Sequence, residues 1–253
     1  MSPLAAMVAG FVLVLVRTGA LVMAAPFLGE GTGFAGYRVA LIGFLSFLLY
    51  ATAGVPVDAP PVELALMGLR ELLIGVYLGF LLQLVLLAVR VAGELVGQEM
   101  GFLTARQVDP TSGMPSSLIT NLYENLFLLA LLAFDGHHWM LRSLERSFAF
   151  APPGRLDLGR QMAPTALAMF GEMFRAGIVF AAPVLVFLMI VSLLIGFLAR
   201  SVPALNVVDV GFTLRVLVAL GALFLFAPLM EPAMRTLHQD LLRWLERGLA
   251  ALA

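Results

Sequence analysis

The sequence predicts an all-α, polytopic membrane protein, and three observations support this prediction. Hydrophobic residues make up 61% of the 253 residues and charged residues only 12%, against about 25% charged residues in soluble domains. The apolar residues form long runs, most of them close to the roughly 20 residues that a helix needs to cross a bilayer. Short stretches rich in Gly and Pro, which are typical of turns, separate these runs.

We expect about six apolar helical segments followed by an amphipathic C-terminal helix, all in one domain that covers residues 1–253. The segments run near Leu4–Leu28, Tyr37–Val55, Val62–Ala105, Leu118–Phe134, Thr165–Leu198 and Val207–Met230. The tail at about 233–253 differs because charged residues are set among leucines, which predicts an amphipathic helix.

Composition argues against several classes of function. The chain contains no cysteine, which excludes disulfides, thiolate metal ligands and cysteine nucleophiles. Its net charge is −1, which gives no electrostatic support for nucleic-acid binding. Arg17 falls inside the first apolar run and no basic region precedes that run, so we do not expect a secretory signal peptide.

The run Val62–Ala105 is too long for one simple membrane crossing. As a single helix it would measure roughly 66 Å, so we expect it to bend, to extend into water or to fold as a hairpin. Charges within the apolar segments are costly against lipid and should face protein or water. Two sets have the spacing of neighbours on a helix face and are expected to form buried polar pairs: Arg90 with Glu94, and Glu172 with Arg175.

Glycines recur at intervals of four in the same run. Gly75 and Gly79 form one stripe, and Gly93, Gly97 and Gly101 form another. Small residues on one helix face let another backbone approach closely. We therefore expect these glycines to form a helix-packing interface.

Sequence motifs give little support for an enzyme. Catalytic and nucleotide-binding motifs such as HExxH, GxSxG and the P-loop are absent from the sequence. His137 and His138 are adjacent, so on a helix their side chains should point in different directions, and we expect a structural or interfacial role. No cofactor is predicted.

The stretch GQEMGFLTARQVDPTSGMP, at Gly97–Pro115, interrupts the apolar sequence with polar, Gly and Pro residues. It is either an ordinary connecting loop or part of a pathway. Irregular backbone at membrane depth is tolerated only where it is buried in protein or lines water.

Several motifs in a fixed order resemble the FliR/SctT family of type III export-gate subunits. They are ELLIGVYLGF (Glu71–Phe80), GELVGQEMGF (Gly93–Phe102), VDP (Val108–Pro110), GHH (Gly136–His138), SFAFAPPG (Ser147–Gly154), APV (Ala182–Val184) and GFLARSVPALNVVDVGF (Gly196–Phe212). The resemblance covers nearly the whole chain. It favours the flagellar branch over the virulence-type injectisome branch.

The resemblance implies a function, partners and a location. Members of the family assemble with FliP- and FliQ-type subunits into an inner-membrane gate for unfolded proteins, beside an FlhB/SctU-type switch subunit. In the flagellar branch this gate belongs to the basal body. Its helices form tilted hairpins that are displaced outward from the bilayer.

The resemblance also implies a role for the polar stretch. In the family, the matching segment is a plug that enters the gate lumen, here at about 102–115. The implied plug and pore residues are Phe102, Arg106, Gln107, Val108, Asp109, Pro110, Gly113, Met114 and Pro115.

The chain departs from the family pattern at a few positions: Asp135 stands where Asn is common, Ala204 where Gln is usual, and Asp209 and Thr213 replace an apolar residue and a proline. A secondary transporter for a small solute is an alternative, with Arg90, Glu94 and Glu172 as an ion pathway. Against this alternative, the two halves of the sequence show no clear internal repeat.

Overall fold

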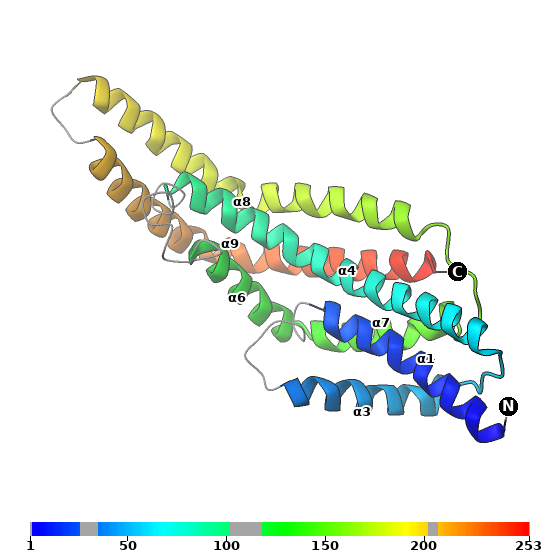
Figure 1. Ribbon diagram of the computed structural model, residues 1–253. Coiled ribbons are helices and arrows are strands. Elements are labelled where there is room, and N and C mark those ends of the chain that lie inside the picture. The colour runs from blue at the N-terminus through cyan, green and yellow to red at the C-terminus, as the bar shows by residue number, and fades with distance from the viewer. Residues whose placement is uncertain (1, 26–34, 102–117, 202–206, 253) are drawn as a thin grey trace. The chain divides into compact units, whose positions relative to one another are not determined.

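The computed structural model describes residues 2–25, 35–101, 118–201 and 207–252, and within these ranges every regular element is an α-helix. The fold is therefore all-α, as predicted. Figure 1 shows the helices α1 (Pro3–Ala24), α3 (Ala35–Ala53), α4 (Pro61–Glu99), α6 (Leu118–Ala133), α7 (Gly136–Phe150), α8 (Met162–Ser201) and α9 (Val207–Ala250).

Local sequence explains where helices α1 and α4 begin. The side chain of Ser2 accepts a hydrogen bond of 3.3 Å from the backbone N–H of Ala5, and Pro3 occupies the first turn of α1. These are common features of a helix N-terminus. Helix α4 also begins with a proline, Pro61, and carries Glu63 in its first turn, where a negative charge is favourable.

Helix α4 is one continuous helix of 39 residues, about 58 Å long at 1.5 Å per residue. Of the arrangements expected for Val62–Ala105, the hairpin is therefore wrong for the described part of this run. Helices α8 and α9 are similarly long, with 40 and 44 residues, and both continue through internal prolines at Pro183, Pro228 and Pro232. All three exceed the roughly 30 Å of hydrocarbon in a bilayer.

Three described helices are long and apolar enough to cross a membrane: Pro3–Ala24, Pro61–Glu99 and Met162–Phe197. A fourth is present if α6 and α7 count as one bent span. The segments Gly36–Thr52 and Gly211–Leu225 form shorter apolar helices. The expected count of about six segments is therefore approximate.

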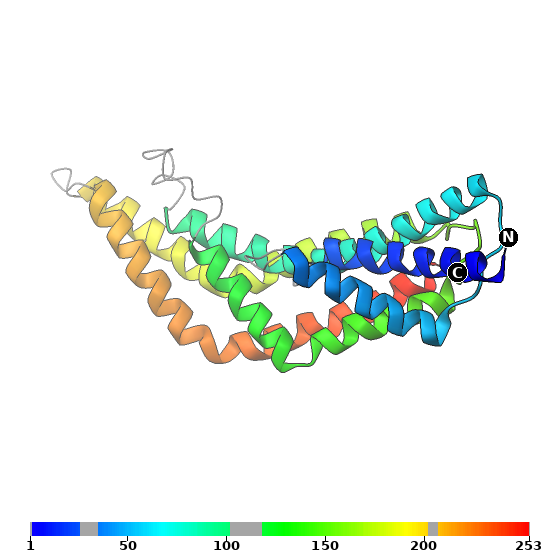
Figure 2. The ribbon, with the colours of Figure 1, turned by 60° about the horizontal axis from the view of Figure 1, so that its bottom comes forward.

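The described residues form two compact units, and α4, α8 and α9 contribute to both. The first unit comprises Met1–Val85, Asp135–Gly171 and Gln239–Ala253. Within it, α1 and α3 lie side by side (Figures 1 and 2). Its buried apolar side chains include Leu13, Val14, Leu21, Leu78, Leu81, Leu144, Leu241 and Leu245.

The second unit comprises Leu86–Phe134 and Glu172–His238. Here the ring of Tyr123 on α6 packs edge-on against Phe180 on α8, with 5.6 Å between the ring centroids. Other buried side chains in this unit include Val89, Ala92, Val96, Phe127, Ala181 and Leu188. The expectation of one domain stays a prediction.

Two features of the helices differ from the expectation. Helix α7 has no counterpart among the expected segments. The expected last span and amphipathic tail are one helix, α9. In the first unit, the apolar face of the tail packs inside the chain: Leu245 and Leu249 are buried, and the Tyr77 hydroxyl on α4 donates to the carbonyl of Gly248 at 3.5 Å.

Candidate functional site

A fully buried arginine on α1 connects three parts of the first unit. The Nε of Arg17 donates to Oε2 of Glu71 on α4 at 2.5 Å. Its two terminal nitrogens donate to Oγ of Ser147 on α7 at 3.2 Å and to the carbonyl of Ala151 at 2.7 Å. The guanidinium also lies over the ring of Phe148, 4.2 Å from its centroid. This arginine therefore has polar partners on two other helices and on the segment that follows α7.

The carboxylate of Glu71 binds a second arginine through its other oxygen. Nη1 of Arg70 donates to Oε1 of Glu71 at 3.0 Å and to the carbonyl of Pro152 at 3.1 Å. Nε of Arg70 donates to the carbonyl of Asp157 at 2.6 Å. The cluster thus holds two cations and one anion, and backbone carbonyls accept hydrogen bonds from both guanidinium groups.

The charged groups of this cluster are buried, and this determines how they affect stability. Arg17 and Glu71 are 0% exposed, and removing charges from water is costly unless every charge is paired and hydrogen-bonded. Such a cluster adds little net stability compared with an apolar core, but it strongly disfavours any arrangement in which its partners separate. We name Arg17, Arg70 and Glu71 the arginine–glutamate cluster.

The first glycine stripe of α4 faces α1 beside this cluster. A Cβ atom added to Gly75 would lie 2.5 Å from the carbonyl oxygen of Arg17 and 2.6 Å from the Cβ of Ala20. A Cβ added to Gly79 would overlap the Cβ of Ala24. Close backbone approach brings the side chains of the two helices into reach of one another.

The second stripe lies in the second unit. A Cβ on Gly93 would lie 2.6 Å from the Cα of Thr120 on α6, so these two helices also approach closely. Gly97 is buried. Gly101, just after α4, has a φ of 90°, a backbone conformation that other residues rarely adopt. A role for these glycines in contacts with other subunits stays a prediction.

Arg90 and Glu94 lie on one face of α4, and both contact α6. Nε of Arg90 donates to Oε1 of Glu124 at 2.5 Å, and the Thr120 hydroxyl donates to Oε1 of Glu94 at 3.0 Å. The two contacts run in opposite directions along the two helices, so α6 packs antiparallel to this part of α4. The side chain of Arg90 is 41% exposed, so this second polar contact is only half-buried.

The remaining expected residues fall into two groups. Glu172 and Arg175 on α8 are exposed on this chain, so their burial stays a prediction about a larger assembly. The expected plug and pore residues, from Phe102 to Pro115, lie outside the described residues.

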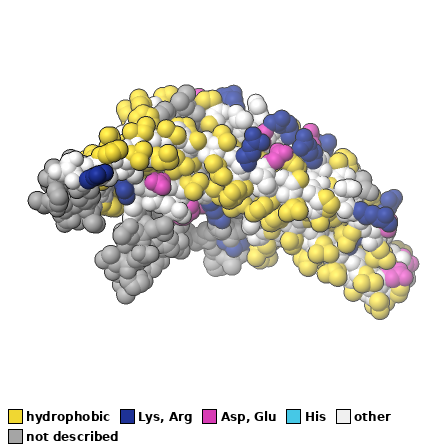
Figure 3. Space-filling model, turned by 90° about the horizontal axis from the view of Figure 1, so that it is seen from above, with side chains coloured by type: hydrophobic (Ala, Val, Ile, Leu, Met, Phe, Trp, Pro, Cys, Tyr) yellow, Lys and Arg dark blue, Asp and Glu magenta, His cyan; other side chains and the backbone are white. Residues whose placement is uncertain are grey.

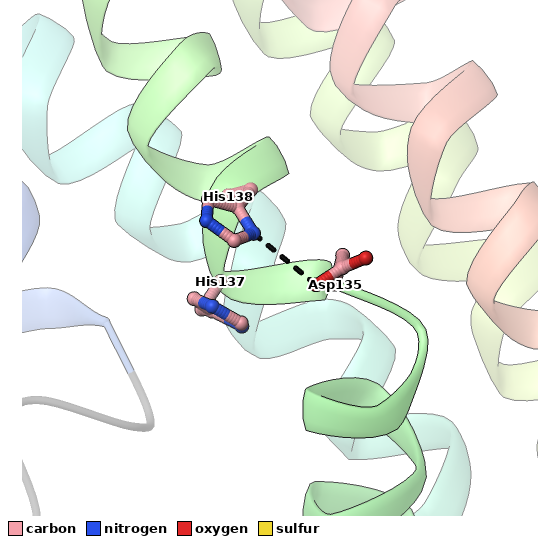
Figure 4. A group of neighbouring side chains, drawn as sticks. All are labelled: Asp135, His137 and His138. Atoms are coloured by element: carbon pink, nitrogen blue, oxygen red, sulfur yellow. Dashed lines mark hydrogen bonds and ion pairs between the residues drawn. The ribbon is translucent and has the colours of Figure 1, made fainter.

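The prediction that the two adjacent histidines point apart is wrong. The rings of His137 and His138 lie with their centroids 4.1 Å apart, and Nδ1 of His138 is 3.3 Å from Oδ1 of Asp135 (Figure 4). Neighbouring side chains leave a helix about 100° apart, and rotation about their first side-chain bonds lets two long rings converge. Their structural or interfacial role stays a prediction.

Sequence reasoning did not select Arg17, Ser147 or Glu124 as site residues. A signal for Arg17 is present, because an arginine within an apolar run of about 20 residues requires an internal partner. Glu124 carries the same signal, because it lies inside the apolar segment Leu118–Phe134. For Ser147 no comparable signal exists, since its partner lies 130 positions away.

Comparison with known proteins gives consistent matches along the chain. Residues 8–241 match the sequence profile of "Bacterial export proteins, family 1". The flagellar biosynthetic protein FliR of Escherichia coli (strain K12) is 31% identical over 231 residues, which cover 90% of this chain and 87% of the relative. The proteins of the same name from Pectobacterium carotovorum and Bacillus subtilis are 33% and 31% identical, over 86% and 83% of this chain and 84% and 82% of each relative.

Proposed function

Because the chain belongs to the bacterial export proteins, family 1, we infer that it is a subunit of the flagellar protein export gate. The match over residues 8–241 is the observation that carries this conclusion. The matches to the relatives named FliR cover most of this chain and most of each relative.

The surface of the chain supports a role within a larger membrane assembly. Hydrophobic side chains cover much of the visible surface (Figure 3). In α8, only 28% of the most apolar stretch of 18 residues is buried within the chain. The side chains of Phe174, Ile190 and Phe197 are exposed. Large exposed apolar surfaces indicate contact with lipid or with other proteins.

In this proposal FliP- and FliQ-type subunits form the rest of the gate, and an FlhB/SctU-type switch subunit lies beside it. The location that follows is the bacterial inner membrane, in the flagellar basal body. The exported cargo is unfolded flagellar protein. In this proposal the chain is a channel component and contributes no catalytic step.

The two polar contacts have a mechanical role in this proposal. The arginine–glutamate cluster holds α1, α4 and α7 together, and Arg90 with Glu124 holds α4 against α6. A protein-conducting gate must prevent leakage of water and ions while its subunits are under mechanical force. The arginine–glutamate cluster suits this task because separating its charges inside an apolar environment is costly. The contact of Arg90 with Glu124 contributes less, because the side chain of Arg90 is 41% exposed.

The segment Phe102–Pro115 completes the proposal as the plug of the gate lumen. Its two prolines, Pro110 and Pro115, restrict the backbone, and Gly113 permits turns. An ordinary connecting loop is the competing interpretation.

Co-purification tests the proposed function. The affinity-tagged chain, expressed at its natural level and extracted in mild detergent, should carry FliP- and FliQ-type subunits with it. Deleting its gene should abolish motility and export of flagellar proteins, and the gene supplied in trans should restore both. Restored virulence-type secretion without motility would indicate the injectisome branch. Purification without partners, together with saturable solute binding, would instead support the transporter alternative.

A further inference from the structure

Three potential metal ligands converge at the start of α7, outside the polar contacts described above. Asp135, His137 and His138 each offer one ligand atom, and these three atoms lie within 4.8 Å of one another (Figure 4). The side chains of Asp135 and His138 are 72% and 59% exposed. A cation could therefore reach these two side chains from solvent and keep water as a further ligand.

The carboxylate of Asp135 is not used to cap the helix. An aspartate that precedes a helix usually accepts a hydrogen bond from a backbone N–H of the first turn. Here Asp135 has a left-handed backbone, with φ 59° and ψ 26°, and its side chain makes no capping hydrogen bond. The carboxylate instead lies beside the imidazole of His138.

The separation of these groups suits a metal ion. With zinc–ligand bonds of about 2.0–2.1 Å and tetrahedral angles, two ligand atoms lie about 3.3 Å apart. Oδ1 of Asp135 and Nδ1 of His138 are 3.3 Å apart. The ring of His137 lies against that of His138, and its Nδ1 is buried and has no hydrogen-bond partner among the described residues.

We propose that Asp135, His137 and His138 form a binding site for a first-row divalent transition-metal ion of the Zn²⁺ type. Two imidazoles and one carboxylate favour Zn²⁺, Ni²⁺ or Cu²⁺ over Mg²⁺ and Ca²⁺, which prefer oxygen ligands. The positive end of the α7 dipole opposes a cation. The negative charge of Asp135 offsets this effect. A metal bound here joins the residue before α7 to the first turn of the helix.

The amino-acid composition of the chain leaves few competing ligands in a metal-binding experiment. The sequence contains three histidines and no cysteine, so His238 is the one other strong ligand for such metals. The full-length chain should be purified in detergent with a tag that lacks histidine, then stripped of metal with EDTA. Calorimetric titration with Zn²⁺ should show one saturable site per chain, and excess Mg²⁺ should not compete.

Four variants separate this site from other binding. His137→Gln and His138→Gln should each weaken Zn²⁺ binding by at least about tenfold, and Asp135→Asn should weaken it through the loss of one charged ligand. His238→Gln, the matched control, should bind as the wild type does. Far-UV circular dichroism and elution volume should be the same for all five proteins.

A second measurement uses only wild-type protein and so does not depend on the folding of any variant. One equivalent of Cu²⁺ should give an electron paramagnetic resonance spectrum with hyperfine coupling from imidazole nitrogen. Absence of saturable Zn²⁺ binding, Zn²⁺ affinity that neither His137→Gln nor His138→Gln lowers, or a Cu²⁺ spectrum without nitrogen coupling would each overturn the proposal.

Discussion

Arg17 and Glu71 lie 54 positions apart in the chain and form a 2.5 Å hydrogen-bonded ion pair in which both side chains are fully buried. Arg70 shares the same carboxylate. The cluster therefore carries one more positive than negative charge, and this imbalance leads to an unequal response to substitution.

We expect Glu71→Gln to be more damaging than Arg17→Met. The first change leaves two buried cations without an anion, whereas the second leaves Arg70 and Glu71 as a neutral pair. Breaking a buried charge pair typically costs about 3–5 kcal/mol. The thermal unfolding midpoint of the purified chain in detergent measures the difference.

The exposed residue Glu145 on α7 provides a control for the cluster. Glu145→Gln removes the same charge from the surface of the same unit and should leave the midpoint almost unchanged. Equal midpoints for Glu71→Gln and Arg17→Met would contradict the charge argument.

Close packing of α1 on α4 predicts opposite effects for two glycine substitutions in one helix. Gly75→Ala places a methyl group against the backbone of Arg17 and should destabilise the chain by about 1–3 kcal/mol. Gly68 has nothing within 4 Å of an added Cβ, so Gly68→Ala should stabilise α4 by roughly 0.5–1 kcal/mol. Unfolding midpoints of the two variants test this, and a stabilising Gly75→Ala would show that the helices do not approach as described.

The contact between α4 and α6 can be measured with a double-mutant cycle. Arg90→Leu and Glu124→Leu should be coupled, so that the double variant loses less stability than the sum of the single variants. Because Arg90 is partly exposed, we expect a coupling of about 0.2–1 kcal/mol. The pair of Arg146 and Glu246, which are not neighbours on one helix and have side chains 49% and 60% exposed, should show a coupling close to zero in the same assay.

Replacement of residues 106–114 by a Gly/Ser linker of equal length tests the proposed plug. If the segment fills the lumen, the variant gate should still assemble with its FliP- and FliQ-type partners, because the packing between helices is unchanged. It should leak ions, because the side chains that fill the lumen have been removed. Ion conductance of cells that make the complete gate measures this leak. A fully assembled variant gate that remains impermeable would leave the connecting-loop interpretation standing.

The burial of His238 leads us to expect that the stability of the folded chain depends on pH. Burial lowers the pKa of His238 from its usual value of 6.5, and its ring packs beside Phe134, with 5.8 Å between the centroids. The unfolded chain therefore binds a proton more readily than the folded chain. The free energy of unfolding should therefore be highest above about pH 6.5, where His238 is neutral in both states. It should fall as the pH is lowered through the pKa of His238 in the folded chain.

The measurement for His238 is the unfolding midpoint of the detergent-solubilised chain between pH 7.5 and 5. His238→Gln should remove part of the decrease on the acid side, because glutamine does not titrate. His138→Gln, which changes an exposed ring, serves as the comparison. Identical pH profiles for wild type and His238→Gln would exclude this histidine as the cause.

The amino-acid sequence by itself determined the all-α membrane class and the approximate positions of the apolar helices. Both depend on local properties: apolar runs of about 20 residues, and the Gly and Pro residues between them. The order of motifs along the chain was also sufficient to indicate the export-gate family. The proposed plug remains a sequence-based prediction, since it lies outside the described residues.

Only the tertiary structure decided which charged groups meet. Sequence spacing indicates neighbours on one helix, such as Arg90 and Glu94, but the partner of Arg17 depends on how α1 is rotated and shifted against α4. Close contact at Gly75 sets that register. The same limit applies to His137 and His138, because the convergence of their rings depends on side-chain rotation that residue spacing does not specify.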